Sequence, residues 1–119
     1  MPINSKSILF VVNSASFFLS HRLPIAVAAK NKGYDVHVAT ADGSDVSKIK
    51  GEGLIHHQIP FNRSGQNLLS DLMTFITLIK LFRSVRPSLV HLVTIKPVIY
   101  GGLAARIVRI KSVVAAISG

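Results

Sequence analysis

Two short segments of the sequence carry side chains that can bind an anion or a sugar hydroxyl. The first contains Asn13, Ser14 and, a few residues later, His21, and the second contains Thr94 and Lys96. Amide, hydroxyl and imidazole groups exchange hydrogen bonds with hydroxyls, and the lysine adds a full positive charge. We therefore predict a substrate-binding site at these five residues. The alternative is that Lys96 is a solvated loop lysine, Thr94 merely ends a strand and His21 stabilises its own loop.

Catalytic carboxylates are scarce in this chain. The acidic residues are Asp35, Asp42, Asp45, Glu52 and Asp71, and their spacing predicts no pair that converges for general acid and base catalysis. The loop after the first apolar run lacks the GxGxxG pattern of dinucleotide sites, and no GxxxxGK[ST] phosphate loop occurs. Any catalytic carboxylates must come from elsewhere, so no catalytic residue and no cofactor is assigned.

The histidines do not predict a metal site. The sequence has no cysteine, which excludes thiolate zinc sites. His56 and His57 are neighbours on an expected strand and point to opposite faces, so they cannot share a metal ion. His37 alternates with valines and His91 lies inside an apolar strand, so both are expected to be packed.

Positive charge is concentrated in the second half of the chain. Lys and Arg total 14 against 5 acids, a net charge of +9. Residues 60–119 hold eight of these basic side chains and a single acid, which indicates an anionic partner or an anionic surface such as a membrane. Nucleic acid is not expected, because no aromatic side chains are interleaved with the cations. The cations assigned to the membrane surface are Lys80, Arg83, Arg86, Arg106, Arg109 and Lys111.

The longest expected helix, Asn67–Val85, is apolar on more than one stripe. One face would hold Leu68, Leu72, Phe75, Ile76, Ile79 and Phe82, and a wider band adds Leu69, Met73, Leu78 and Leu81. Such a helix can lie in a bilayer interface with its terminal cations on lipid headgroups. The alternative is a core helix whose terminal cations complement the helix dipole.

The apolar segments are too interrupted to span a membrane. The longest apolar stretch is broken by Ser70, Asp71 and Lys80, short of the roughly 18 residues that a spanning helix needs. The N-terminal segment is basic and apolar like a signal peptide, but polar residues interrupt it. We expect a cytoplasmic protein that is peripheral at the inner face of the cell membrane.

Short β-branched runs alternate with amphipathic stretches along the chain. The expected strands are Ile8–Val12, Asp35–Thr40, Leu54–Ile59, Leu89–Val93 and Ser112–Ile117. The expected helices run from Ser20 to Lys32, from Ser44 to Gly51, from Asn67 to Val85 and from Pro97 to Arg109. This alternation predicts an α/β, Rossmann-like three-layer sandwich with a parallel sheet of about five strands in the order 3-2-1-4-5 and helices on both faces.

That strand order places the polar residues in one crevice. Strands 1 and 4 are neighbours whose helices leave on opposite faces, and ligands bind beyond their carboxyl ends. The segments Asn13–His21 and Thr94–Pro97 lie there, and each leads into a helix N-terminus that favours anions. The 119 residues form one domain that stops directly after the fifth strand, so we expect a piece of a longer protein or one that needs a partner there.

Segments from nearly the whole chain match one family pattern. They are Ile8–Asn13, Ser20–Ala26, Lys32–Thr40 and Val90–Pro97. In this order they resemble the N-terminal half of a GT-B-type glycosyltransferase of family 4. Two more segments are similar to the bacterial branch that builds lipid-linked surface polysaccharides, namely Val98–Arg106 and Ile117–Gly119.

The resemblance implies a function for the whole protein. Residues 1–119 would form a single Rossmann-like half-domain that binds the acceptor, a lipid-linked or other saccharide. The nucleotide sugar would bind a second half, which carries the family's glutamates and is missing from this chain. The implied activity is hexosyl or N-acetylhexosaminyl transfer in polysaccharide biosynthesis, with this fragment inactive alone. The alternative is a non-enzymatic basic module of flavodoxin-like fold that docks on membranes or a protein partner.

Overall fold

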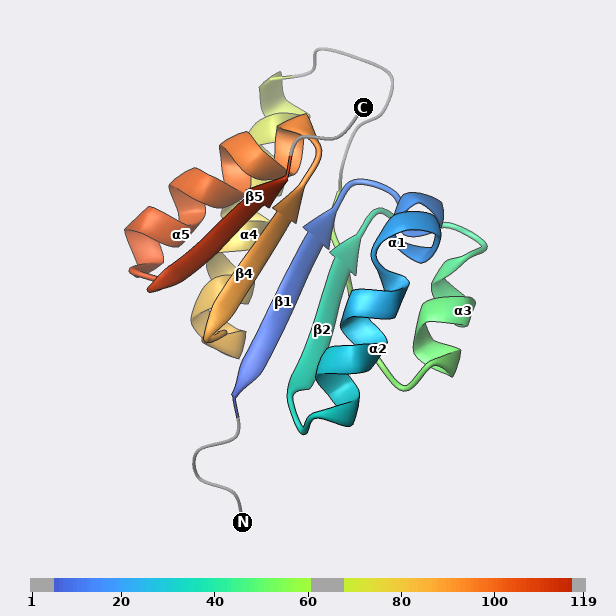
Figure 1. Cartoon of the computed structure of the whole chain (residues 1–119). Helices are drawn as coiled ribbons and strands as arrows, with labels where there is room; N and C mark the ends of the chain where they lie inside the picture. The colour runs from blue at the N-terminus through green and yellow to red at the C-terminus, as the bar shows by residue number, and fades with distance from the viewer. Residues whose placement is uncertain (1–5, 61–67, 117–119) are drawn as a thin grey trace.

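A five-stranded parallel sheet forms the centre of the computed structural model, which describes residues 6–60 and 68–116 (Figure 1). Its strands are β1 (Ser7–Val12), β2 (Asp35–Thr40), β3 (Ile55–Gln58), β4 (Leu89–Val93) and β5 (Ser112–Ala116). They lie in the order β3-β2-β1-β4-β5, and all neighbouring pairs are parallel. The predicted strand order is confirmed.

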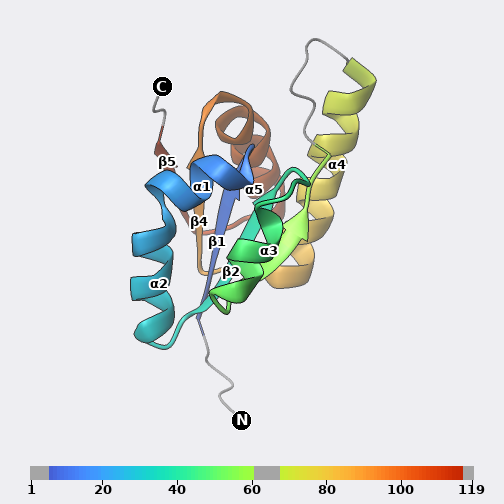
Figure 2. The same ribbon diagram turned by 90° about the vertical axis from the view of Figure 1, so that its right-hand side faces the viewer.

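Helices cover both faces of this sheet, as predicted for a three-layer sandwich. One face carries α1 (Ala15–His21), α2 (Leu23–Asn31) and α3 (Val46–Gly51). The other carries α4 (Leu68–Val85), the π-helical turn η1 (Pro97–Gly101) and α5 (Gly102–Val108). Figure 2 shows α2 and α4 on opposite sides of the strands.

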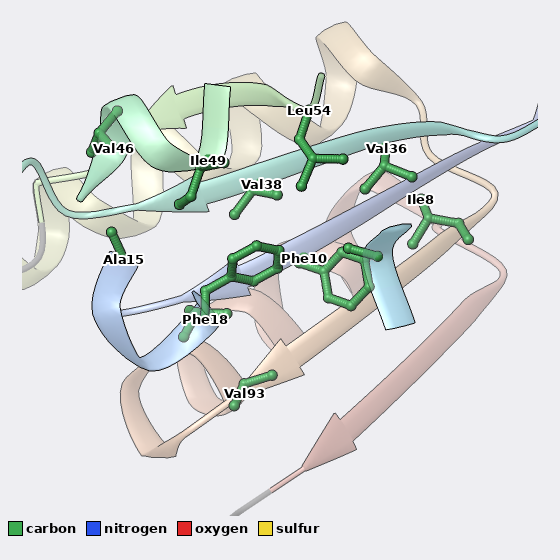
Figure 3. Close-up of a cluster of buried hydrophobic side chains, with 12 residues drawn as sticks. Ile8, Phe10, Ala15, Phe18, Val36, Val38, Val46, Ile49, Leu54 and Val93 are labelled. Atoms are coloured by element: carbon green, nitrogen blue, oxygen red, sulfur yellow. The ribbon is translucent and has the colours of Figure 1, made fainter. Parts of the chain in front are cut away.

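The central strand β1 supplies apolar side chains to both layers. Phe10 and Val12 belong to the core beneath α1, α2 and α3, whereas Leu9 and Val11 belong to the core beneath α4 and α5. The ring of Phe10 meets that of Phe18 edge to face, with centroids 5.6 Å apart (Figure 3). Because both faces of β1 are covered, its sequence is continuously apolar rather than alternating.

The segment after β1 forms two helices, so the prediction of one helix that begins at Ser20 was wrong. Ser14 is the N-cap of α1, and its Oγ accepts a hydrogen bond from the Phe17 N–H at 3.3 Å. Ser20 lies inside α1, with its hydroxyl bonded to the Ser16 carbonyl. Pro24 has no N–H to continue the α1 hydrogen bonds, and it occupies the first turn of α2 instead.

Other element boundaries differ from the predictions by a few residues. The N-cap of α3 is Asp45 rather than Ser44. The predicted helix after Pro97 is divided, because its first turn is π-helical and the α-helix begins only at Gly102. It stops at Arg109, where φ is +66°. The expected cap Asn67 and the end of the fifth strand, with the Ile117–Gly119 motif, lie outside the described residues.

The buried face of α4 differs from the stripe that its sequence favours. Thr74, Leu78 and Phe82 are buried against the sheet, and Phe75, Ile79 and Leu81 are partly buried. The side chains left exposed are Leu68, Leu69, Leu72, Met73 and Ile76. The Thr74 hydroxyl helps to set this rotation, because it lies 2.9 Å from the Pro60 carbonyl oxygen, next to the end of β3. Of the predicted face, Phe82 is buried and Phe75 and Ile79 are partly buried, whereas Leu68, Leu72 and Ile76 are exposed.

Candidate functional site

The carboxyl edge of the sheet brings two of the predicted residues next to each other. Val12 of β1 is in register with Val93 of β4, so Asn13 and Thr94 follow directly at adjacent strand ends. Thr94 has φ +72°, a conformation that a β-branched residue rarely adopts. Its N–H donates to the Ala116 carbonyl at 3.0 Å, which ties this position to the end of β5. Such backbone strain is concentrated at functional sites.

Asn13 and Ser14 also border a small polar cavity of about 130 Å³. The cavity lies between the loops that follow β1 and β2, and its lining consists of Asn13, Ser14, Ala15, Ser16, Ala41, Asp42, Gly43, Ser44 and Asp45. The lining holds hydroxyls, an amide and two carboxylates but no cationic side chain, so it suits hydroxyl or amino groups better than phosphate. Within the described part of the chain, this polar cavity therefore lies on the β1–β2 side of the crevice.

Lys96 is already paired, which the sequence did not reveal. Its Nζ lies 3.2 Å from Asp71 Oδ1, and the Tyr100 hydroxyl donates to Asp71 Oδ2 at 3.0 Å. The two side chains of the ion pair are mostly shielded, with exposed fractions of 32% for Lys96 and 15% for Asp71. The hydrogen bond to Asp71, followed by burial and the Asp71 charge, raises the pKa of Tyr100, so its phenol stays a donor. Lys96 therefore presents a charge that Asp71 partly neutralises.

His21 ends a helix and does not begin one. It is the last residue of α1, rather than the first residue of a helix beside the crevice, so that placement was wrong. Its ring stacks on Phe17 with centroids 4.2 Å apart, and Nδ1 lies 3.3 Å from the Phe17 carbonyl oxygen. These contacts agree with the alternative in which His21 stabilises its own segment.

The other histidines are paired or packed. The Nδ1 of His37 lies 2.9 Å from Nε2 of His57, and Nε2 of His56 lies 2.8 Å from the Thr40 hydroxyl. Burial lowers the pKa of each of these three imidazoles. Burial and then the nearby Arg22 charge lower the pKa of His91. Within residues 6–60 and 68–116, no group of three or more metal-ligating side chains gathers at one point.

The six cations assigned to a membrane surface are all exposed, and they belong to the C-terminal halves of α4 and α5 or follow these helices. Three of them, Arg86, Arg109 and Lys111, border one shallow groove of about 500 Å³. In Figure 1 the C-terminal ends of α4 and α5 lie at the edge of the sheet where the strands begin. The cations and the crevice are therefore at opposite edges, whereas the exposed apolar half of α4 is at the crevice edge.

Sequence reasoning missed several polar residues of this site. Asp71 and Tyr100 lie beside Lys96, and Asp42 and Asp45 lie beside Asn13. One signal was present, since Asp71 is the single acid among residues 60–119. Its partners could not be read from the sequence, because 25 and 29 residues separate it from Lys96 and Tyr100.

A parallel sheet in the order 3-2-1-4-5 with helices on both faces defines a Rossmann-like α/β domain. Residues 7–119 match the family model described as glycosyl transferase 4-like. The chain belongs to this family. No curated protein matches the chain.

Solved glycosyltransferases share the fold. A glycosyltransferase from Rickettsia africae ESF-5 is similar with a TM-score of 0.76 and 18% identity over 94% of this chain and 29% of its own. MurG from Acinetobacter baumannii has the same TM-score at 16% identity, over 96% of this chain and 36% of its own. The glycosyltransferase VinC, solved in complex with DTDP, has a TM-score of 0.66 at 18% identity, over 92% of this chain and 34% of its own. The chain thus spans about a third of the length of these enzymes.

Proposed function

We propose that this chain is the acceptor-binding part of a glycosyltransferase, which transfers a hexosyl or N-acetylhexosaminyl group from a nucleotide sugar to a saccharide acceptor. The family match over residues 7–119 carries this proposal. Donor binding and the catalytic carboxylates are assigned to a second half outside these residues. This chain covers only 29% and 36% of the length of two similar glycosyltransferases. Both of those proteins are therefore much longer than this chain, which supports a second half.

The acceptor is a saccharide with a lipid-linked anionic group. The cavity beside Asn13 and Ser14, lined by hydroxyls and carboxylates, supports binding of sugar hydroxyls. Lys96 follows β4, the strand next to β1 on the side away from that cavity, and supports binding of a phosphate. Exposed Leu68, Leu72 and other apolar residues of α4 support contact with the lipid. The matching pathway is the synthesis of a bacterial surface polysaccharide.

Acceptor binding is the direct test of this site. The purified chain is titrated with a polyprenyl diphosphate-linked monosaccharide in nanodiscs. Lys96→Ala should weaken binding by about tenfold or more, because a charge-assisted hydrogen bond contributes about 1.5–3 kcal/mol. Asn13→Ala should weaken it less, by about fivefold. Lys48→Ala, which removes an exposed lysine of α3, is the control and should bind like the wild type.

The division between two halves has its own test. The chain alone, mixed with a nucleotide sugar and the acceptor, should release no nucleoside diphosphate. Turnover by the purified chain would contradict the assignment of donor binding to another half. Equal acceptor affinity of Lys96→Ala, Asn13→Ala and Lys48→Ala would instead contradict the crevice assignment.

We also propose that the outer face of α4 and α5 lies on an anionic membrane. Exposed apolar residues continue from α4 onto α5 as Leu103 and Ile107, each about half exposed, and the six cations surround the far end of both helices. None of the described helices is both long and apolar enough to cross a bilayer. An amphipathic surface of this kind is typical of interfacial binding, with about 1 kcal/mol for each well-placed cation.

Vesicle binding separates the contribution of the exposed apolar side chains from that of the cations. Phosphatidylglycerol vesicles should bind the chain more tightly than phosphatidylcholine vesicles, and added salt should remove that difference. Leu72→Ser should weaken binding at any salt concentration, and Arg83→Glu only at low salt. Binding that neither substitution changes would contradict a membrane face on α4. Vesicle binding with no acceptor binding would favour the alternative of a non-enzymatic docking module.

A further inference from the structure

Two arginines adopt left-handed backbone conformations at equivalent places in the fold. Arg86 follows α4 with φ +50°, and Arg109 follows α5 with φ +66°. Each lies three residues before a strand, and the first residues of those strands, Leu89 of β4 and Ser112 of β5, are in register. A residue with positive φ after a helix is usually glycine, because other side chains are strained there. Both positions therefore hold a long cationic side chain at a conformational cost.

These two arginines border the same groove of about 500 Å³, at the edge where the strands begin. Lys111 adds a third cation to its lining, and Ser88 and Ser112 add hydroxyls that can donate hydrogen bonds. Pro87 and Val108 are buried and supply an apolar part of the lining. All the lining residues lie in the described part of the chain, and none of them is acidic. The groove therefore presents positive charge and hydrogen-bond donors to a ligand.

The positive charge in this groove exceeds what the helix ends can neutralise. Both α4 and α5 end here, and the free carbonyls at a helix C-terminus are equivalent to about half a negative charge. Three cationic side chains against two such ends leave an excess of about two positive charges. A phosphate monoester carries a charge of about −1.5 to −2 at pH 7 and presents three acceptor oxygens. Guanidinium groups bind such oxygens through two parallel hydrogen bonds, so this ligand matches the groove in charge and in donors.

We propose that this groove binds a phosphate monoester group through Arg86, Arg109 and Lys111. The inference deepens the membrane contact proposed above when the ester belongs to a lipid such as phosphatidic acid, and it is independent of that contact when the ester belongs to a soluble molecule. Phosphatidylglycerol is a phosphate diester with a single negative charge, so it matches the groove less well. The groove lies at the sheet edge opposite the crevice, so a ligand there leaves the crevice open.

Titration of the full chain with inorganic phosphate tests the groove, in about 0.15 M sodium chloride so that diffuse attraction is screened. The side-chain N–H resonances of the arginines should shift and reach saturation. Arg109→Gly should weaken binding by about tenfold or more, because it removes a guanidinium group from the phosphate. Glycine tolerates the positive φ at this position, so the variant should keep its fold.

Two lysines at the same edge of the sheet give a matched comparison. Lys32 is the C-cap of α2, next to the start of β2, and it does not border the groove. Lys111→Gln and Lys32→Gln each remove one positive charge. Lys111→Gln should weaken phosphate binding by about fivefold, whereas Lys32→Gln should change it by less than about twofold. Equal weakening by the two variants, or a titration without saturation, would overturn the proposal.

Vesicles distinguish the two sources of the ester. If the source is a lipid, phosphatidic acid vesicles should bind the chain more tightly than phosphatidylglycerol vesicles, and Arg109→Gly should remove the difference. Saturable phosphate binding together with equal binding to both kinds of vesicle supports the groove with a soluble ester as its ligand. Saturable phosphate binding without vesicle binding supports the groove and contradicts the membrane contact. Vesicle binding without saturable phosphate binding overturns the groove and leaves the membrane contact in place.

Discussion

The Asp71 carboxylate is the residue that connects α4 to the candidate site. One oxygen accepts from Lys96 and the other from Tyr100, so a single side chain binds two groups on the segment after β4. Asp71→Asn should lower the free energy of unfolding by about 1–2 kcal/mol, since it weakens a partly shielded ion pair and a hydrogen bond. Urea unfolding of both proteins measures the difference.

An exposed ion pair in the same chain provides the comparison for Asp71. Lys48 lies 3.3 Å from Asp45, but its side chain is 71% exposed. Lys48→Ala should therefore change the free energy of unfolding by less than about 0.5 kcal/mol. If Asp71→Asn costs no more than Lys48→Ala, the Asp71 contacts do not stabilise the site.

Stability should depend on pH through four imidazoles. Burial is the first cause that lowers the pKa of His37, His56, His57 and His91. The folded state therefore favours the neutral rings, and the unfolded chain binds protons first as the pH falls below 6.5. The free energy of unfolding should be constant above this value and decrease below it.

Urea unfolding at about pH 7.5 and about pH 5.5 tests this dependence. His57→Gln should show a smaller loss between the two conditions than the wild type, because one of the four groups no longer titrates. His21→Ala is the control, since His21 is exposed at the end of α1. A wild-type chain that is more stable at the lower pH would contradict the prediction.

At the scale of elements, the π-helical turn η1 packs closely on β4 because the residue at the contact is a glycine. A Cβ built at Gly101 would lie 2.5 Å from Leu92 Cδ2, and Leu92 is 1% exposed. Gly101→Ala should therefore destabilise the chain by about 1–3 kcal/mol, because a buried leucine has little room to move. Thermal unfolding measures this loss.

The next residue gives a matched control for Gly101. Gly102 has φ −62°, and a Cβ there would meet nothing within 4 Å. Gly102→Ala should stabilise α5 by about 0.4–1 kcal/mol, since alanine restricts the unfolded chain and fits the helix. If both substitutions changed the stability equally, the close packing of η1 on Leu92 would not contribute to the stability of the chain.

At the scale of the whole molecule, β5 is an exposed apolar edge of the sheet. Val113 and Val114 point to opposite faces and are 42% and 44% exposed. An exposed strand edge is a template for pairing with another chain. Val114→Lys should therefore raise the solubility of the chain while it changes the free energy of unfolding by less than about 0.5 kcal/mol.

Light scattering at increasing protein concentration, together with urea unfolding, checks this substitution. Val38→Lys is the opposite case, because Val38 is fully buried under α1–α3 and the charge should unfold the chain. Unchanged association of Val114→Lys would show that the β5 edge does not drive self-association.

The sequence by itself determined the layers and the strand order. Continuous apolar runs such as Ile8–Val12 mark strands that are covered on both faces, and this pattern depends only on neighbours along the chain. The β2 range Asp35–Thr40 and the β4 range were predicted to the residue. Right-handed crossovers together with the doubly wound arrangement then predicted the strand order, and the meeting of the carboxyl ends of β1 and β4 followed from it.

Tertiary structure alone decided the partners of the polar side chains. The pairing of Asp71 with Lys96, and of His37 with His57, depends on the rotation of α4 and on the register of β2 with β3. The rotation of α4 was not readable, because the helix is apolar on several stripes and only the sheet selects which of them is buried. Periodicity reports which face of an element is apolar, whereas contacts between distant residues depend on angles and registers set by packing.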